Sequence, residues 1–175
     1  MQIAHVTAPG RGETNRLLAR AAQVLRAEGL RLAGTVQLDT ETPRSPLCDM
    51  DVLVLPDGPT LRISTSLGPG ASGCRLDPAG LEDSVALTLA NVERGPDLVI
   101  INKFGKQEAA GRGFRDAIGA AMVADIPVLV GVNEANRPAL DSFCEGAAEQ
   151  LDPTLEAILH WARWAARDAN RTSAS

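Results

Sequence analysis

A glycine-rich stretch near residue 10 has the residue types and the position of a phosphate-binding loop. It follows an apolar run, Ile3–Val6, and precedes a helical pattern that starts at Glu13. In such a loop, glycines let backbone N–H groups turn toward a phosphate, and the positive end of the following helix favours the anion. The residues expected to contact an anion here are Gly10, Arg11, Gly12 and Thr14.

The loop departs from the complete Walker A motif at one position. That motif needs a lysine for the outer phosphates and a serine or threonine for magnesium, and here Glu13 stands at the lysine position before Thr14. One unit-charge contact at about 4 Å and an effective dielectric of about 20 contributes about 4 kcal/mol, so reversing the charge costs about 8 kcal/mol before screening. The alternative is an ordinary strand-to-helix turn, in which the helix dipole stabilises Glu13.

A basic cluster follows a second apolar run, Asp97–Ile101. Its members come after the predicted carboxyl end of a strand, where ligands bind in open α/β sheets. In a chain of net charge −5 this local positive charge favours an anion site. The alternative is solvated surface charge. The cluster consists of Lys103, Lys106, Arg112 and Arg115, of which the first three are the expected anion contacts.

The segment Ser64–Arg75 combines hydroxyls, glycines and a guanidinium. Many O–H and N–H donors beside one arginine suit a nest for a tetrahedral oxyanion, phosphate or molybdate alike. A surface loop is the alternative. Cys48 and Cys74 are interpreted as two small thiols, with a soft-metal or redox pair as the other reading. The expected anion contacts in this segment are Ser64, Ser66, Gly70, Ser72 and Arg75.

The elements that position these residues follow from hydrophobic periodicity. Apolar runs without alternation predict parallel strands covered by helices on both faces, and helical patterns separate them, which predicts a doubly wound sheet. The expected strands are Ile3–Val6, Leu32–Gln37, Asp97–Ile101 and Ile126–Val132, the first, third and fourth being interior, with an inserted hairpin of Asp51–Leu55 and Leu61–Ser64. The expected helices include Phe114–Ala124, Pro138–Gln150 and Pro153–Asp168.

Composition excludes several classes of protein. The pI of about 5.0 and the 3% aromatic content argue against nucleic-acid binding and against an anionic membrane surface. No apolar run is long enough to span a bilayer, and no signal peptide is recognised at the start. Three cysteines do not form a disulfide framework, so a reducing cytoplasm is expected. One domain over 1–170 is predicted, with a disordered tail at 171–175.

Two resemblances extend the analysis. The run from Asp97 through Glu108 resembles the Walker B region of a family of small nucleoside-triphosphatases first described in thermophiles, whose signature reads Asp-Glu-Ile-Gly-Lys-Met-Glu. The likeness implies a P-loop fold and matches Asn102 to a magnesium-binding aspartate and Lys103 to a catalytic glutamate. More closely, the runs 48–51, 68–77 and 102–113 resemble an uncharacterised bacterial family that is described as nucleoside-triphosphatase-like and is associated with molybdenum-transport components.

The expected protein is a three-layer P-loop NTPase-like α/β domain that binds without hydrolysing. Its ligand is an oxyanion, phosphate-like or molybdate-like, or a nucleotide, in a role connected with molybdenum handling. No catalytic residue and no metal site is assigned, because Glu13, Asn102 and Lys103 replace the hydrolytic residues. A divergent active nucleoside-triphosphatase that uses Lys103 or Lys106 is the alternative. Two partners are considered: a second copy of this chain, in a homo-oligomer, and a molybdenum-transport or cofactor protein.

Overall fold

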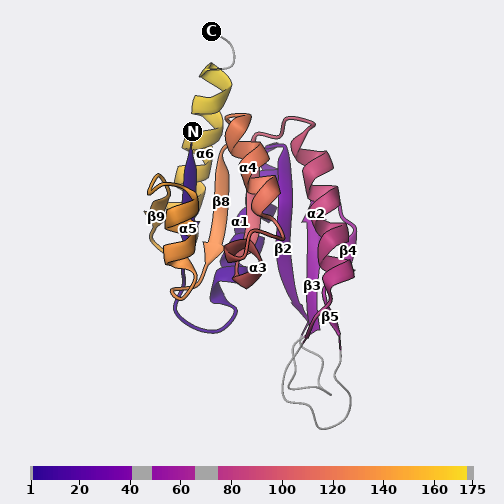
Figure 1. Cartoon of the computed structure of the whole chain (residues 1–175). Helices are drawn as coiled ribbons and strands as arrows, with labels where there is room; N and C mark the ends of the chain where they lie inside the picture. Colours follow the sequence, from indigo (N-terminus) through magenta and orange to yellow (C-terminus); the bar gives the residue numbers. More distant parts are fainter. Residues whose placement is uncertain (1, 41–48, 66–74, 173–175) are drawn as a thin grey trace.

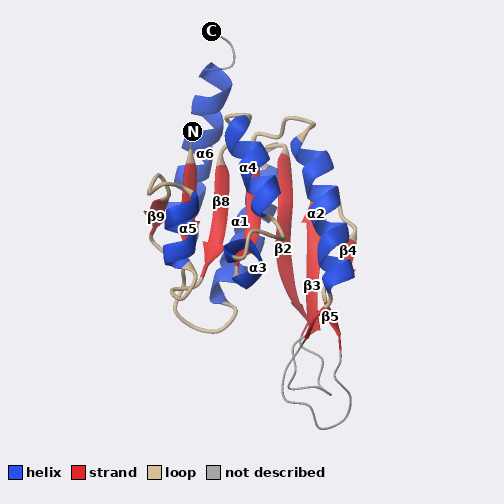
Figure 2. Ribbon diagram, viewed as in Figure 1, coloured by secondary structure: helices blue, strands red, loops and turns tan. Residues whose placement is uncertain are grey.

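Residues 2–40, 49–65 and 75–172 are described by the computed structural model, in which helices cover both faces of a sheet (Figures 1 and 2). The main sheet contains β1 (Ile3–Val6), β2 (Leu32–Thr40), β3 (Asp49–Leu55), β4 (Thr60–Arg62), β7 (Leu98–Phe104), β8 (Val128–Val132) and β9 (Glu149–Leu151). A separate two-stranded ladder contains β5 (Ser64–Thr65) and β6 (Arg75–Leu76). The helices are α1 (Glu13–Ala27), α2 (Pro78–Val92), α3 (Lys106–Ala109), α4 (Arg115–Val123), α5 (Arg137–Phe143) and α6 (Leu155–Thr172).

The strand order in the main sheet is β4-β3-β2-β7-β8-β1-β9. The five strands from β2 to β9 in this order pair in parallel, whereas β3 is antiparallel to both β2 and β4. This confirms the predicted three-layer, mainly parallel α/β sheet with an inserted hairpin. The hairpin extends one edge of the sheet, and Gly58 takes a φ of +97° in its turn.

The central strands are buried on both faces because helices pack on each side. Along β7, Leu98 and Ile100 join the core under α1 and α6, whereas Val99 and Ile101 join the core under α2, α4 and α5. All four side chains are fully buried, and each burial stabilises the fold by about 1.5–3 kcal/mol. The three strands predicted as interior, β1, β7 and β8, each have a neighbour on both sides.

Gly34 lets β2 and β7 approach closely. Its φ is +111°, and a Cβ at this position would lie 1.9 Å from the carbonyl oxygen of Ile100. Only glycine fits such a contact. The same pairing brings Gln37 of β2 beside Asn102 of β7 near the carboxyl ends of both strands.

The helix predicted over 138–150 is wrong in its second half. Helix α5 ends at Phe143, and Gly146 at φ +74° turns the chain toward β9. Strand β9 pairs in parallel with β1, so sheet pairing overrides the local helical pattern. Cys144 at the end of α5 is buried, and burial raises the pKa of its thiol to about 11.

Helix α6 carries two tryptophans, Trp161 and Trp164, in different surroundings. Trp161 is buried and donates from Nε1 to Glu149 Oε2 over 3.1 Å, whereas Trp164 is 52% exposed. Only Trp161 belongs to the core. The helix continues to Thr172, two residues into the stretch that was assigned to the tail.

Candidate functional site

The predicted site segments follow strands that end at one edge of the sheet. Strand β1 leads into the 7–12 loop, and β7 leads into α3 (Figure 1). Neighbouring strands lie about 4.8 Å apart, so β1 and β7, with β8 between them, are about 10 Å apart. The β5–β6 ladder adjoins β3, about 19 Å from β1 by the same spacing. A single small oxyanion could contact both the 7–12 loop and the segment that follows β7. It could not contact the β5–β6 ladder at the same time.

The 7–12 loop has the backbone form that an anion nest needs. Gly10 and Gly12 adopt φ values of +98° and +79°, and Gly12 is the N-cap of α1 without a side-chain cap. The backbone N–H of Ala8 donates to Thr14 Oγ1 over 2.9 Å, which folds the loop over the start of the helix. The N–H groups of the first helical turn therefore have no side-chain acceptor at the N-cap. An anion at this point would accept from them.

Glu13 does not face the loop as an uncompensated charge. Its carboxylate forms an ion pair with Arg16, one turn further along α1, and its side chain is 48% exposed. A Cβ at Gly10 would lie 3.2 Å from Glu13 Cγ, so the stem of the side chain lies against the loop backbone. Pairing and solvent exposure both reduce the cost of about 8 kcal/mol that was expected for replacing a lysine by a bare acid.

Asn102 is the centre of an amide cluster formed with Asn15 and Gln37. Its Oδ1 accepts from the backbone N–H of Gln37 over 3.0 Å, and its Nδ2 donates to Asn15 Oδ1 over 3.2 Å and to Gln37 Oε1 over 3.4 Å. The residue is 5% exposed. Both ends of the amide are thus engaged by α1 and β2. A neutral, engaged amide is a poor ligand for magnesium, so the residues at this position do not fit that ion.

Glu108 organises the 105–114 segment after β7. It is 4% exposed, and its two carboxylate oxygens accept from the backbone N–H groups of Gly105 over 2.8 Å and Phe114 over 3.0 Å. A Cβ at Gly113 would lie 2.2 Å from Glu108 Oε1, so the chain wraps tightly around the carboxylate. Glu108 therefore fixes the shape of the segment that carries the basic cluster.

The basic cluster divides into three exposed side chains and one that is held by packing. Lys103, Lys106 and Arg112 are exposed. Arg115 instead donates from Nη1 to the Glu108 carbonyl oxygen over 3.3 Å and lies over the Phe143 ring at 4.3 Å from its centroid. Arg115 supports the segment, and the other three side chains extend into solvent.

The third predicted segment is described only at its two ends. Ser64 is buried, and its Oγ accepts from the backbone N–H of Met50 over 2.9 Å, so it ties β5 to β3. Arg75 pairs with Thr65 in the β5–β6 ladder. Ser66, Gly70 and Ser72, and also Cys48 and Cys74, lie outside the described residues.

Three polar residues at this edge were not predicted from the sequence as part of the site. Asn15, Gln37 and Glu108 provide the amide cluster and the carboxylate that shape it. Asn15 directly follows Thr14, and this position was the one available signal for it. Within the described ranges, no group of three His, Cys, Asp or Glu side chains is arranged to hold a metal ion. In the same ranges, no helix has both the length and the apolar character needed to cross a membrane.

The fold is of the P-loop NTPase-like kind. The solution structure of a human cancer-related nucleoside triphosphatase matches with a TM-score of 0.62 over 97% of both chains, at 18% identity, which shows a shared fold. The chain belongs to the family described as "Protein of unknown function (DUF2478)", which matches residues 3–161.

A curated relative extends the comparison to transport. Over 151 residues the chain is 38% identical to the molybdenum import ATP-binding protein ModC 2 of Bradyrhizobium diazoefficiens. The match covers 86% of this chain and 17% of that protein, so the chain spans about a sixth of the length of its relative. The name of this relative supports the molybdenum-related resemblance that was predicted from the sequence.

Proposed function

We propose that the protein is a non-hydrolytic binding module, which takes an oxyanion or a nucleotide at the carboxyl edge of its sheet and acts in molybdenum handling. The observation that carries the proposal is the engagement of Asn102. Its amide is joined to Gln37 and Asn15, at the position where a hydrolase would hold magnesium through a carboxylate. Nucleotide hydrolysis of the usual type depends on that ion to neutralise charge on the transferred phosphoryl group.

The acids of the first turn of α1 and of the 105–114 segment are also engaged by other groups. Lys103 is exposed and is not a carboxylate, and both oxygens of Glu108 accept from backbone N–H groups. Glu13, which lies beside the loop, is paired with Arg16. None of these groups is placed to accept a proton from an attacking water.

The donors at the edge favour a compact anion. The N-terminal turn of α1 offers backbone N–H groups. The segment after β7 adds three exposed basic side chains, Lys103, Lys106 and Arg112, and β7 lies about 10 Å from β1. A phosphate-like or molybdate-like dianion satisfies this arrangement without a magnesium ion. The name of the 38%-identical relative, a molybdenum import ATP-binding protein, supports molybdate and ATP as the first ligands to test.

Calorimetry tests the proposal with molybdate, tungstate, sulfate and ATP, the last with and without Mg²⁺. We expect at least one of them to bind, and Arg112→Ala to weaken it about five-fold, the effect of about 1 kcal/mol from a charged hydrogen bond. Arg167→Ala removes an exposed arginine from α6 and is the matched control, with no effect. Absence of binding by all four ligands overturns the binding role. Magnesium-dependent ATP turnover near 1 per second, on the usual enzyme scale, that Thr14→Ala abolishes overturns the non-hydrolytic role.

A further inference from the structure

Helix α2 has apolar residues in the middle of its solvent face and two hydroxyl residues on its buried face. Leu87 is 39% exposed, and Ala86 and Ala90 beside it are also exposed. On the other side of the helix, Ser84 and Thr88 are fully buried, and their hydroxyls donate to carbonyl oxygens of the preceding turn over 2.6 and 2.8 Å. A surface helix normally turns its apolar residues inward and its polar residues outward. The middle of the outer face of α2 therefore has the composition of a covered surface.

Four residues of this outer face form one stripe along the helix: Asp83, Leu87, Ala90 and Arg94. Their spacing of four, three and four residues follows one side of an α-helix, and all four are exposed. Arg94 directly follows the C-cap Glu93, whose αR backbone continues the helical path to it. The stripe therefore begins with an acid, ends with a base and is apolar between them.

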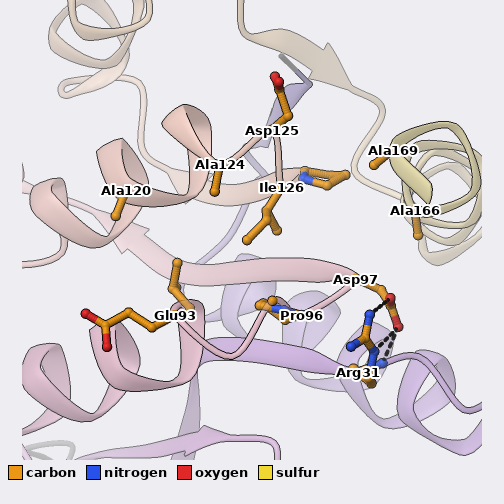
Figure 3. Close-up of a pocket in the computed structure, with 13 residues that line it drawn as sticks. Arg31, Glu93, Pro96, Asp97, Ala120, Ala124, Asp125, Ile126, Ala166 and Ala169 are labelled. Atoms are coloured by element: carbon orange, nitrogen blue, oxygen red, sulfur yellow. Dashed lines mark hydrogen bonds and ion pairs between the residues drawn. The ribbon is translucent and has the colours of Figure 1, made fainter. Parts of the chain in front are cut away.

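The two charges of the stripe are not used within the described part of the chain. No ion pair or hydrogen bond joins the side chain of Asp83 or Arg94 to another described residue. The two lie about 16 Å apart along the helix axis, at the usual rise per residue, so they do not pair with each other. Glu93 lines a cavity with Ala120 and Ala124 of α4 (Figure 3), so it lies to the side of the stripe. Both ends of the stripe are therefore available to a partner.

The stripe is complementary to itself when a second copy of α2 lies antiparallel across it. A two-fold axis midway between Leu87 and Ala90 places Asp83 against Arg94 of the second copy at one end, and the reverse pair at the other end. In the middle, Leu87 of each copy packs on Ala90 of the other, and the small alanines let the helix axes approach to about 8–10 Å. The antiparallel arrangement also sets the positive end of each helix beside the negative end of the other.

We propose that the protein forms a two-fold symmetric dimer in which the stripe on α2 packs against the same stripe of a second copy. Helix α4 lies beside α2 (Figure 1), and its Val123, 89% exposed, adds apolar surface to the same face. A stable interface buries about 800 Å² per partner, more than one pair of 15-residue helices provides, so the dimer is weak, with a dissociation constant of about 10–100 μM. Helix α2 runs from the carboxyl edge of the sheet to the start of β7, so the antiparallel pair points the two carboxyl edges in opposite directions and leaves both 7–12 loops open.

Sedimentation equilibrium of the full chain, from about 1 to about 500 μM, tests the proposal. We expect a monomer–dimer equilibrium that Leu87→Glu abolishes. Asp83→Arg and Arg94→Asp each set like charges against one another at both ends of the stripe, so each alone should weaken the dimer by at least about ten-fold. An equimolar mixture of these two variants should dimerise as strongly as the parent, because each charge then meets its opposite across the two-fold axis.

Arg20→Asp is the matched control for the change of charge. Arg20 is exposed on α1, which covers the opposite face of the sheet, so its substitution should leave the dimer unchanged. The double variant Asp83→Arg/Arg94→Asp, which exchanges the two charges within one chain, should dimerise like the parent. The proposal is overturned by a parent chain that stays monomeric at about 500 μM, by single variants that dimerise as well as the parent, or by a double variant and a mixture that stay monomeric while their circular dichroism is that of the parent.

Discussion

Replacement of Glu108 by glutamine tests whether one buried carboxylate holds the segment that carries Lys106 and Arg112. The carboxylate accepts two backbone N–H groups, from Gly105 and Phe114. Glutamine has a single oxygen, so one of these N–H groups would face an amide NH₂ and lose its acceptor. A hydrogen bond to a charged group contributes about 1.5–3 kcal/mol, and an unsatisfied buried donor costs about 1–3 kcal/mol.

The neutral amide of Glu108→Gln is easier to bury than a carboxylate, which offsets part of this loss. We expect a net decrease of about 2 kcal/mol in the free energy of unfolding, equivalent to about 4–8 °C in melting temperature for a domain of this size. Urea unfolding measures the first quantity and calorimetric melting the second. Anion affinity at the carboxyl edge should fall in the same variant, because Lys106 and Arg112 lose their fixed positions.

Glu134→Gln provides the matched control for Glu108→Gln. Glu134 is 65% exposed and pairs with Arg137 over 3.2 Å on the surface, so the same chemical change there should cost less than about 0.5 kcal/mol. Equal effects of the two substitutions would refute the reasoning. A destabilised Glu108→Gln protein that keeps full anion affinity would instead show that the 105–114 segment takes no part in the site.

Three further changes test the fold and the site. Gly34→Ala should lower the free energy of unfolding by more than about 3 kcal/mol in urea titrations, since its Cβ would meet the Ile100 carbonyl oxygen. Asn102→Leu should cost about 1–3 kcal/mol, because the Gln37 N–H loses its acceptor. Burial lowers the pKa of the His5 imidazole, so unfolding experiments should show stability that is complete above pH 6.5 and decreases as the pH falls below it.

Each of these three tests has a contrary outcome, and two of them have a control variant. Gly95→Ala introduces a side chain at φ +67° with nothing within 4 Å, so it isolates backbone strain from the collision at Gly34; equal costs would contradict the packing argument. Asn102→Leu with unchanged stability would show that the amide cluster is not needed. His5→Leu should flatten the decrease between pH 7 and pH 5, and an unchanged slope would assign the decrease to other groups.

The sequence was most informative where one chemical property decides the structure. The run Asp97–Ile101 predicted an interior strand correctly, because burial on both faces excludes polar residues from Leu98 to Ile101. The three-residue strand β9 was missed because its two exposed residues, Glu149 and Gln150, carry no apolar signal. Its place in the sheet comes from pairing with β1, which lies almost 150 residues earlier in the chain.

The candidate site was predictable in its residue types but not in its contacts. The resemblance to the small nucleoside-triphosphatases implied that Asn102 replaces a carboxylate, but not that its amide is engaged by Gln37, 65 positions away. The pairing of Glu13 with Arg16 could have been predicted, because residues three positions apart on a helix are neighbours.

The position of β1 in the sheet affects the order in which the protein can assemble during synthesis. Strand β1 is made first, yet both of its neighbours, β8 (Val128–Val132) and β9 (Glu149–Leu151), are among the last strands to be made. Such pairing of distant segments slows folding, because a long stretch of chain must be ordered before the contact forms. On the ribosome, the 7–12 loop therefore has no strand beside β1 to support it until residue 128 and beyond have emerged. The nascent chain can therefore support the 7–12 loop from both sides of β1 only after β8 and β9 have been made.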